Sequence, residues 1–302
     1  MRRRRLWTWP HRRRRMKVSL FAPLVSPVND AAYVSALAKG AEARGFHSIW
    51  LGEHVVLFDN YDAEYPYEEN GKIPVGGDRG LLEPITALSF MAAQTSRIRL
   101  GTGICLVPQR NPVYTAKEIA AVDYLSRGRV DFGVGVGWLE EEFTALGVPF
   151  ARRGARCREY LEVIKSLWTE DVSSYSGEFY QLEPCRQYPK PVQQPGPPIY
   201  FGGESDAALR RVADIGAGWY GFNVAAEDVP GYLLRLDGFL EASGRTRSDI
   251  RTVICPYGHK LNKDRAAQYQ DAGVDELVAM IVGRDLDELE RWLDRLAGEY
   301  VA

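Results

Sequence analysis

The chain has 302 residues, of which 45% are hydrophobic and 26% are charged, a composition typical of a folded globular protein. Its formal net charge of -2 gives no overall attraction to nucleic acid or to an anionic membrane surface. No stretch approaches the roughly 18 consecutive apolar residues of a membrane span. The four cysteines are too far apart for a CxxC metal or redox motif, so we expect free thiols in a cytoplasmic protein.

The first 15 residues differ from the rest because they contain eight arginines. Removing these positive charges from the total of -2 leaves about -10. We interpret residues 1–15 as a disordered tail or a wrongly assigned start, with Met16 beginning a single domain over residues 16–302. A polyanion-binding arm and an export signal are the alternatives. The apolar run after Met16 is short and interrupted by Pro23, which argues against export.

From Met16 onward, apolar runs alternate with segments of helical period, the pattern of parallel strands joined by helices. The predicted strands are Val18–Leu24, Ser48–Leu51, Ile98–Leu106, Val130–Val134, Pro198–Phe201, Gly218–Phe222, Arg251–Pro256 and Glu276–Val282. The predicted helices cover residues 30–45, 84–96, 112–126, 152–168, 205–214, 227–243, 263–272 and 285–298. Eight such units without a break in composition favour a closed (β/α)8 TIM barrel of the α/β class over an open doubly wound sheet.

Two long segments interrupt this repeat. Residues 57–83 are rich in tyrosine, glycine, proline and acids, and residues 172–198 predict a hairpin followed by a proline-rich return. Both come after strands, which in a barrel places them on the face that carries the active site. We expect them to close a pocket, since loops of this length usually have a function, with solvent-exposed insertions as the alternative.

Glu53 and His54 directly follow the second predicted strand, where a barrel presents its functional side chains. A histidine exchanges a proton near neutral pH, and an adjacent acid can tune its charge. The pair is therefore a catalytic candidate, with a structural histidine as the alternative. His259 also follows a strand and is a second candidate, whereas we expect no functional role for His47 and His11.

The glycines after the fifth predicted strand give the strongest signal for an anion site. Gly202 and Gly203 end that strand, and Ser205 then caps the next helix, followed by Asp206. The glycines allow a phosphate to approach the backbone, and the helix start offers free N–H donors. A turn of this kind is weak evidence by itself.

The G-x-G-x-G run over residues 133–137 lacks the spacing of a dinucleotide fingerprint. Its glycines either leave room for a flat ring at the barrel end or serve tight packing. Gly101 and Gly103 lie inside a strand, where glycine marks a bulge or a close approach. The histidines lack carboxylate or cysteine partners at ligand spacing, so no metal site is predicted.

Several segments resemble one family: IWLGEHV, RIRLGTGICLVPQRNPVYTAKEIAAVDYLSRGRVDFGVGVGWLEEEFTALGVPFARRGARCREYLEVIKSLW and PPIYFGGESDAALRRVADIGAGWY. They are similar to the luciferase-like monooxygenase superfamily, and within it to the actinobacterial type that uses the deazaflavin coenzyme F420. The resemblance runs from about Lys17 to the C-terminus and is specific in its middle stretch. The arginine-rich start has no counterpart.

The resemblance implies a cofactor ring at the C-terminal mouth of the barrel. His54 matches a histidine that assists proton transfer, and Glu53 matches the acid beside it. Gly103-Ile104 falls where the family often has a non-proline cis peptide that supports the ring. The positions that match cofactor-binding residues are Gly103, Ile104, Leu106, Val136, Gly137, Gly202, Gly203, Ser205 and Asp206. Relatives that oxidise a sugar phosphate carry a glutamate where this chain has Trp138, so we expect Trp138 to line an apolar or aromatic substrate pocket instead.

The resemblance therefore predicts hydride transfer between F420 and a small organic substrate. An FMN-dependent monooxygenase supplied by a separate reductase is the first alternative, and a cofactor-binding barrel without catalysis is the second. Family members often form homodimers, so a homodimer is expected, and an enzyme that reduces the cofactor is a possible partner.

Overall fold

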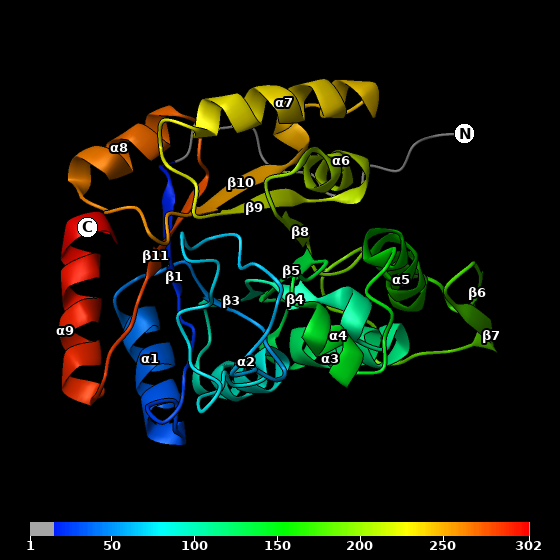
Figure 1. Cartoon of the computed structure of the whole chain (residues 1–302), viewed down its shortest axis with the longest axis horizontal. Coiled ribbons are helices and arrows are strands. Elements are labelled where there is room, and N and C mark those ends of the chain that lie inside the picture. The colour runs from blue at the N-terminus through cyan, green and yellow to red at the C-terminus, as the bar shows by residue number, and fades with distance from the viewer. Residues whose placement is uncertain (1–14, 302) are drawn as a thin grey trace.

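A closed barrel of parallel strands surrounded by helices forms the centre of the computed structural model, which describes residues 15–301 (Figure 1). The barrel strands are β1 (Lys17–Phe21), β2 (Ser48–Leu51), β3 (Arg99–Thr102) continued by β4 (Cys105–Leu106), β5 (Val130–Gly135), β8 (Ile199–Gly202), β9 (Gly218–Phe222), β10 (Arg251–Cys255) and β11 (Glu276–Met280). Strand β1 pairs in parallel with both β2 and β11, and β3 pairs with β5, so the sheet closes on itself. The predicted TIM barrel is confirmed.

The helices alternate with the strands as predicted, and their ends differ from the predicted ones by no more than two residues. They are α1 (Ala31–Ala43), α2 (Pro84–Gln94), α3 (Pro112–Ser126), α5 (Arg153–Thr169), α6 (Asp206–Ile215), α7 (Val229–Ala242), α8 (Lys263–Asp271) and α9 (Leu286–Leu296). Asp30, Asn111 and Asp285 accept hydrogen bonds from the first turns of their helices, which explains where these helices begin. A short additional helix, α4 (Glu140–Ala145), was not predicted.

The third predicted strand, 98–106, is not continuous. It consists of β3 and β4, separated at Gly103-Ile104, where the peptide bond is cis. The first strand ends at Phe21 rather than Leu24, because Pro23 cannot donate to the sheet and Leu24 has a φ of 49°. The last strand likewise ends at Met280 instead of Val282.

Buried polar groups seal the N-terminal end of the barrel. The Glu276 carboxylate is 2% exposed and accepts hydrogen bonds from Ser19 Oγ at 2.7 Å, Ser48 Oγ at 2.6 Å and Trp50 Nε1 at 2.9 Å. His47, for which no function was expected, lies with Nε2 3.8 Å from the same carboxylate. Above this layer, large buried side chains fill the interior: Phe21, Trp50, Tyr200, Tyr220, Val253, Cys255 and Val278.

The 57–83 loop lies across the C-terminal face of the barrel and is fixed to several neighbouring loops. The Tyr67 hydroxyl donates to Glu204 Oε2 at 3.1 Å, and Asn223 Nδ2 donates to the Tyr67 carbonyl at 3.3 Å. The Tyr257 hydroxyl donates to Glu68 Oε1 at 2.7 Å. These contacts join the loop to the segments after β8, β9 and β10, as its predicted role as a cover requires.

The second insertion lies elsewhere. Its strands β6 (Ser173–Ser176) and β7 (Gln181–Cys185) form the predicted hairpin, beside α5 at the edge of the molecule (Figure 1). The backbone amides of residues 178–180 donate to the Glu159 carboxylate on α5. None of the described residues 172–198 lines the cavity at the barrel mouth, so the expectation that this hairpin closes the pocket is wrong.

Candidate active site at the barrel mouth

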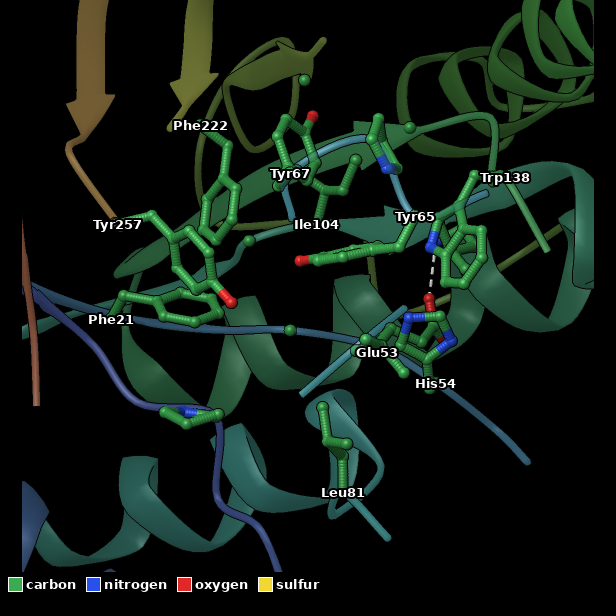
Figure 2. Close-up of a pocket in the computed structure, with 18 of the residues that line it drawn as sticks. Phe21, Glu53, His54, Tyr65, Tyr67, Leu81, Ile104, Trp138, Phe222 and Tyr257 are labelled. Carbon is green, nitrogen blue, oxygen red and sulfur yellow. Dashed lines mark hydrogen bonds between the residues drawn. The ribbon is translucent and has the colours of Figure 1, made fainter. Parts of the chain in front are cut away.

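A cavity of about 360 Å³ lies between the C-terminal strand ends and the 57–83 loop (Figure 2). Cavities that bind small molecules in proteins commonly measure about 300–1,000 Å³. Ten of the sequence-predicted site residues line it: Glu53, His54, Gly103, Ile104, Leu106, Val136, Gly137, Trp138, Gly202 and Gly203. Ser205 and Asp206 lie just outside it at the start of α6, and the second candidate histidine, His259, is exposed and is not part of the lining.

The side chain of Ile104 shapes the cavity floor. It lies against two glycines, because a Cβ atom added at Gly135 or Gly202 would lie 2.0 or 2.8 Å from Ile104 Cδ1. A Cβ atom at Gly133 would lie 1.9 Å from the carbonyl oxygen of Thr102. Of the two interpretations of the glycine run, tight packing therefore explains the first two glycines. Gly137, with a φ of 79°, provides a backbone turn that other residues rarely adopt.

Glu53 forms an ion pair with Arg110, and within residues 15–301 no hydrogen bond or ion pair joins it to His54. Its side chain is 1% exposed, bonds to the Arg110 guanidinium and accepts a hydrogen bond from the Leu106 amide. Arg110 also lies 3.1 Å from both Glu83 and Glu118. Burial raises the pKa of Glu53, while Arg110 and the Leu106 amide oppose this rise. This arrangement anchors the chain after β4 to the end of β2.

The acid beside His54 is Glu142 on the unpredicted helix α4. His54 Nδ1 lies 3.3 Å from Glu142 Oε2, and the two side chains are 9% and 0% exposed. The contact suits an ion pair, although the ring nitrogen is not aligned for a regular hydrogen bond. Burial alone would raise the pKa of Glu142, but the neighbouring His54 ring and hydrogen bonds from Gln109 and the Val55 amide outweigh burial and lower that pKa. Glu142 was not predicted from the sequence, because it lies 88 positions after His54.

Aromatic rings surround the rest of the cavity. Figure 2 shows Phe21, Phe222 and Tyr257 on one side and His54 with Trp138 on the other. Neighbouring ring centroids lie 4.7–5.8 Å apart along the series Tyr257, Phe222, Tyr67, Tyr65, Trp138 and His54. Among the described lining residues, only Glu53 and His54 can carry a charge near neutral pH. The main chamber therefore suits an uncharged molecule.

One arginine lies at the rim of the chamber, and a second arginine lies near it on α6. Arg153 Nε donates to the carbonyl of the lining residue Gly137 at 2.9 Å. Arg211, on α6, lies with Nη1 3.4 Å from the position of a Cβ atom added at Gly154. Burial lowers the pKa of both guanidinium groups, and neither forms an ion pair within residues 15–301. Sequence analysis did not single out either arginine, because nothing in the local pattern marks them.

The start of α6 adds backbone donors to this rim. Gly203 has a φ of 100°, and Ser205 caps the helix by accepting from the Ala208 amide at 3.3 Å. The first amides of a helix have no partner within it, so they can bind an anion. The Asp206 carboxylate is turned toward Arg235, which leaves its backbone amide as the group that can face an anion.

Glu204, in the same turn, connects three segments of the face. Its Oε1 accepts from the Phe222 amide at 2.9 Å, and its Oε2 accepts from the Tyr67 hydroxyl. Burial raises the pKa of Glu204 to about 6, against the lowering effect of these two donors. The residue lies within the predicted anion motif, but its partners are distant in sequence and were not predicted.

Two other kinds of feature are absent from residues 15–301. Over residues 15–301, no group of three or more His, Cys, Asp and Glu side chains is arranged to hold a metal ion. In the same part of the chain, every helix is too short or too polar to cross a membrane.

Comparisons with known proteins agree on one family. The profile of the luciferase-like monooxygenase family matches residues 16–297. An uncharacterized protein of Mycobacterium tuberculosis is 32% identical over 265 residues, which cover 88% of this chain and 93% of that protein. The F420-dependent glucose-6-phosphate dehydrogenase of Kineococcus radiotolerans is 31% identical, with 71% and 60% of the two chains covered. The FMNH2-dependent dimethylsulfone monooxygenase of Pseudomonas putida is 30% identical, with 69% and 51% covered.

A solved structure supports the same fold. The F420-dependent tetrahydromethanopterin reductase of Methanopyrus kandleri superposes with a TM-score of 0.74 at 17% identity, and 95% of this chain and 99% of that chain are covered. Because the two sequences are only 17% identical, this likeness shows a shared fold and nothing more. With the profile match over almost the whole barrel, the comparisons show that the chain belongs to the luciferase-like monooxygenase family.

Proposed function

We propose that the chain is an oxidoreductase that binds coenzyme F420 at the barrel mouth and transfers a hydride between it and a small, uncharged organic substrate. The observation that carries this proposal is the cavity itself, which combines an apolar chamber, a buried histidine beside a carboxylate, and an arginine bonded to the lining residue Gly137. The similarity to an F420-dependent dehydrogenase supports it. The similarity to an FMNH2-dependent monooxygenase supports the alternative, FMN-dependent monooxygenation.

The residues present fit a phosphate-bearing tricyclic cofactor. The ring would rest on the floor made by Gly103 and Ile104, bordered by Leu106, Val136 and Gly137. Its phosphate would meet the amides after Gly202 and Gly203, including those of Ser205 and Asp206, and the cations Arg153 and Arg211. When bound, the deazaflavin would supply the carbon that donates or accepts the hydride.

His54 would hold the accompanying proton. Its Nδ1 faces Glu142, which leaves Nε2 as the nitrogen available to a molecule in the cavity. The buried carboxylate at 3.3 Å fixes the orientation of the imidazole ring. We had expected Glu53 to tune the charge of His54. In this proposal Glu142 has that role, and Glu53 positions the backbone around the site.

Titration of the purified protein with F420 and with FMN tests the cofactor assignment. We expect binding of F420 in the micromolar range and at least tenfold weaker binding of FMN. Arg153→Met should weaken binding of F420 while leaving binding of its phosphate-free ring fragment unchanged. Tighter binding of FMN would favour the monooxygenase, and binding of neither cofactor would end the proposal.

His54→Ala tests the proton role. The variant should retain its affinity for the cofactor, because the backbone and rim that would hold it are unchanged, and should lose turnover by roughly 10²–10⁴-fold, the usual contribution of a general acid or base. Unchanged turnover would remove His54 from the mechanism. A wild-type protein that binds cofactor but turns over no substrate in a metabolite screen would support the non-catalytic barrel.

A further inference from the structure

Two tyrosine hydroxyls face each other inside the cavity. Tyr65, from the 57–83 loop, and Tyr257, which follows β10, both line it, and neither side chain is fully buried. Figure 2 shows their hydroxyl oxygens pointing toward each other within the cavity. The two groups are close enough to act on each other's pKa. Because the rest of the chamber is mainly apolar, polar groups placed here are suited to orient a bound molecule.

The other two tyrosines among the described lining residues do not offer a donor to a ligand. The Tyr67 hydroxyl donates its proton to Glu204 Oε2 at 3.1 Å. Tyr220 is 1% exposed, and its hydroxyl oxygen is itself buried. Tyr65 therefore remains as the tyrosine donor in the open part of the cavity, with the Tyr257 oxygen beside it.

Glu68 gives this pair of hydroxyls a fixed direction. The Tyr257 hydroxyl donates to Glu68 Oε1 at 2.7 Å. A hydroxyl has a single proton and a carboxylate is a stronger acceptor than another hydroxyl, so the Tyr257 oxygen is left to accept a bond from the cavity. Burial raises the pKa of both tyrosines, so Tyr65 keeps the proton that it can donate. The pair thus offers one donor and one acceptor.

Neighbouring rings hold both side chains in place. The ring centroid of Tyr65 lies 5.4 Å from that of Tyr67 and 5.1 Å from that of Trp138. The ring centroid of Tyr257 lies 4.7 Å from that of Phe222. Tyr257 also has a φ of 49°, a left-handed conformation that bulky residues rarely adopt and that is found most often at functional sites. Both hydroxyls are therefore oriented before a ligand arrives, which lowers the entropic cost of binding.

The pair lies on the side of the cavity that the proposed cofactor leaves open. The cofactor ring would rest on the floor at Gly103-Ile104, at the ends of the strands, whereas Tyr65 belongs to the loop that covers the C-terminal face. A ring on this floor turns its other face toward the loop. A substrate stacked on that face shares the space that Tyr65 and Tyr257 line.

We propose that Tyr65 and Tyr257 bind the hydroxyl group of an uncharged, mainly apolar alcohol, with Tyr65 donating to the alcohol oxygen and Tyr257 accepting the alcohol proton. A hydroxyl group matches this pair because it accepts and donates at once, whereas a carbonyl group can only accept. The apolar surroundings disfavour a charged group at the same place. This inference rests on the proposed function, because it names the substrate class of the same site.

Three probes with the same carbon skeleton separate the two roles: 1-phenylethanol, acetophenone and ethylbenzene. Calorimetric titration should be run on the protein loaded with the cofactor that it binds and on the cofactor-free protein. Tyr65→Phe should weaken binding of the alcohol and of the ketone by roughly fivefold, as expected for one neutral hydrogen bond, and leave ethylbenzene binding unchanged. Tyr257→Phe should weaken binding of the alcohol by a similar factor and should not weaken binding of the ketone, because only the alcohol donates a proton.

Tyr61→Phe is the matched control. Tyr61 belongs to the same loop, and its ring centroid lies 5.7 Å from that of Trp138. Its hydroxyl accepts from the Ile73 amide at 2.8 Å, and the residue is not part of the cavity lining. Any change in loop order caused by this control should alter the binding of all three probes by the same factor. The ratio of alcohol affinity to ethylbenzene affinity should therefore fall in Tyr65→Phe and stay at the wild-type value in Tyr61→Phe.

Several results would overturn the inference: an unchanged affinity ratio in Tyr65→Phe, full alcohol affinity in Tyr257→Phe, a lower ratio in Tyr61→Phe, or no binding of any probe at millimolar concentration. Selective loss of alcohol binding in His54→Ala but not in Tyr65→Phe would place the hydroxyl group at the histidine and would also overturn it. So would weaker cofactor binding with unchanged probe binding, which would assign the tyrosines to the cofactor. Failure of the proposed function is read separately, from the F420 and FMN titrations of the wild-type protein.

Discussion

The Glu53–Arg110 pair gives the sharpest test of how the site is held together. Glu53→Gln keeps the size of the side chain and an acceptor for the Leu106 amide but removes the charge that faces Arg110. Breaking a buried ion pair costs about 3–5 kcal/mol. Arg110 retains Glu83 and Glu118 at 3.1 Å, so we expect a loss of about 2–3 kcal/mol. For a domain of this size, that lowers the melting temperature by roughly 5–10 °C.

Urea denaturation measures this loss as a lower midpoint with an unchanged slope. Glu118→Gln is the control, because its carboxylate pairs with the same arginine but is 41% exposed, and a pair of that kind contributes less than about 1 kcal/mol. The double variant Arg110→Met/Glu53→Gln should lose less unfolding free energy than the sum of the losses of the two single variants. An unfolding free energy of Glu53→Gln within about 0.5 kcal/mol of wild type would refute this reasoning and return Glu53 to the catalytic candidates.

Three further predictions concern other positions. Burial raises the pKa of Glu204 from 4.5 to about 6, so the protonated side chain contributes about 2 kcal/mol to the stability of the fold. This contribution is present below pH 4.5 and is lost as the pH rises through 6. Glu204→Gln should abolish this pH dependence of the unfolding free energy, measured by urea denaturation. Gly135→Ala should destabilise by about 1–3 kcal/mol through overpacking against Ile104, and Ile104→Ala in the same chain should recover part of that loss in thermal melts. Glu276 has a lowered pKa, because its partners outweigh burial, so Glu276→Gln should reduce stability at neutral pH, with a deficit that narrows as the pH falls below the ordinary glutamate range.

The alternation of strands and helices was predictable because it depends on local patterns. Helix α3 was predicted with its observed ends, since Asn111 and Pro112 form a strong start signal. The division of the third strand at Gly103 was not predicted from the glycines alone, which indicated a bulge or a close approach; only the resemblance pointed to a cis peptide there. Helix α4 was missed because six residues are too few to show a helical period.

The sequence predicted where the site residues lie better than it predicted which side chains they contact. Glu53 and His54 both line the cavity, but adjacent residues at a strand end point in different directions, so their proximity in sequence did not make them a pair. Their partners, Arg110 and Glu142, come from other parts of the chain and are brought near by barrel closure. Such long-range contacts carry no signal in a single sequence.

The sealed N-terminal end of the barrel, centred on Glu276, has a consequence for the order of events. With that end filled, molecules reach the chamber from the C-terminal face of the barrel, where the 57–83 loop lies. Two molecules that share one passage cannot overtake each other. The molecule that sits deeper must therefore arrive first and depart last, which predicts a compulsory order in steady-state kinetics rather than a random one.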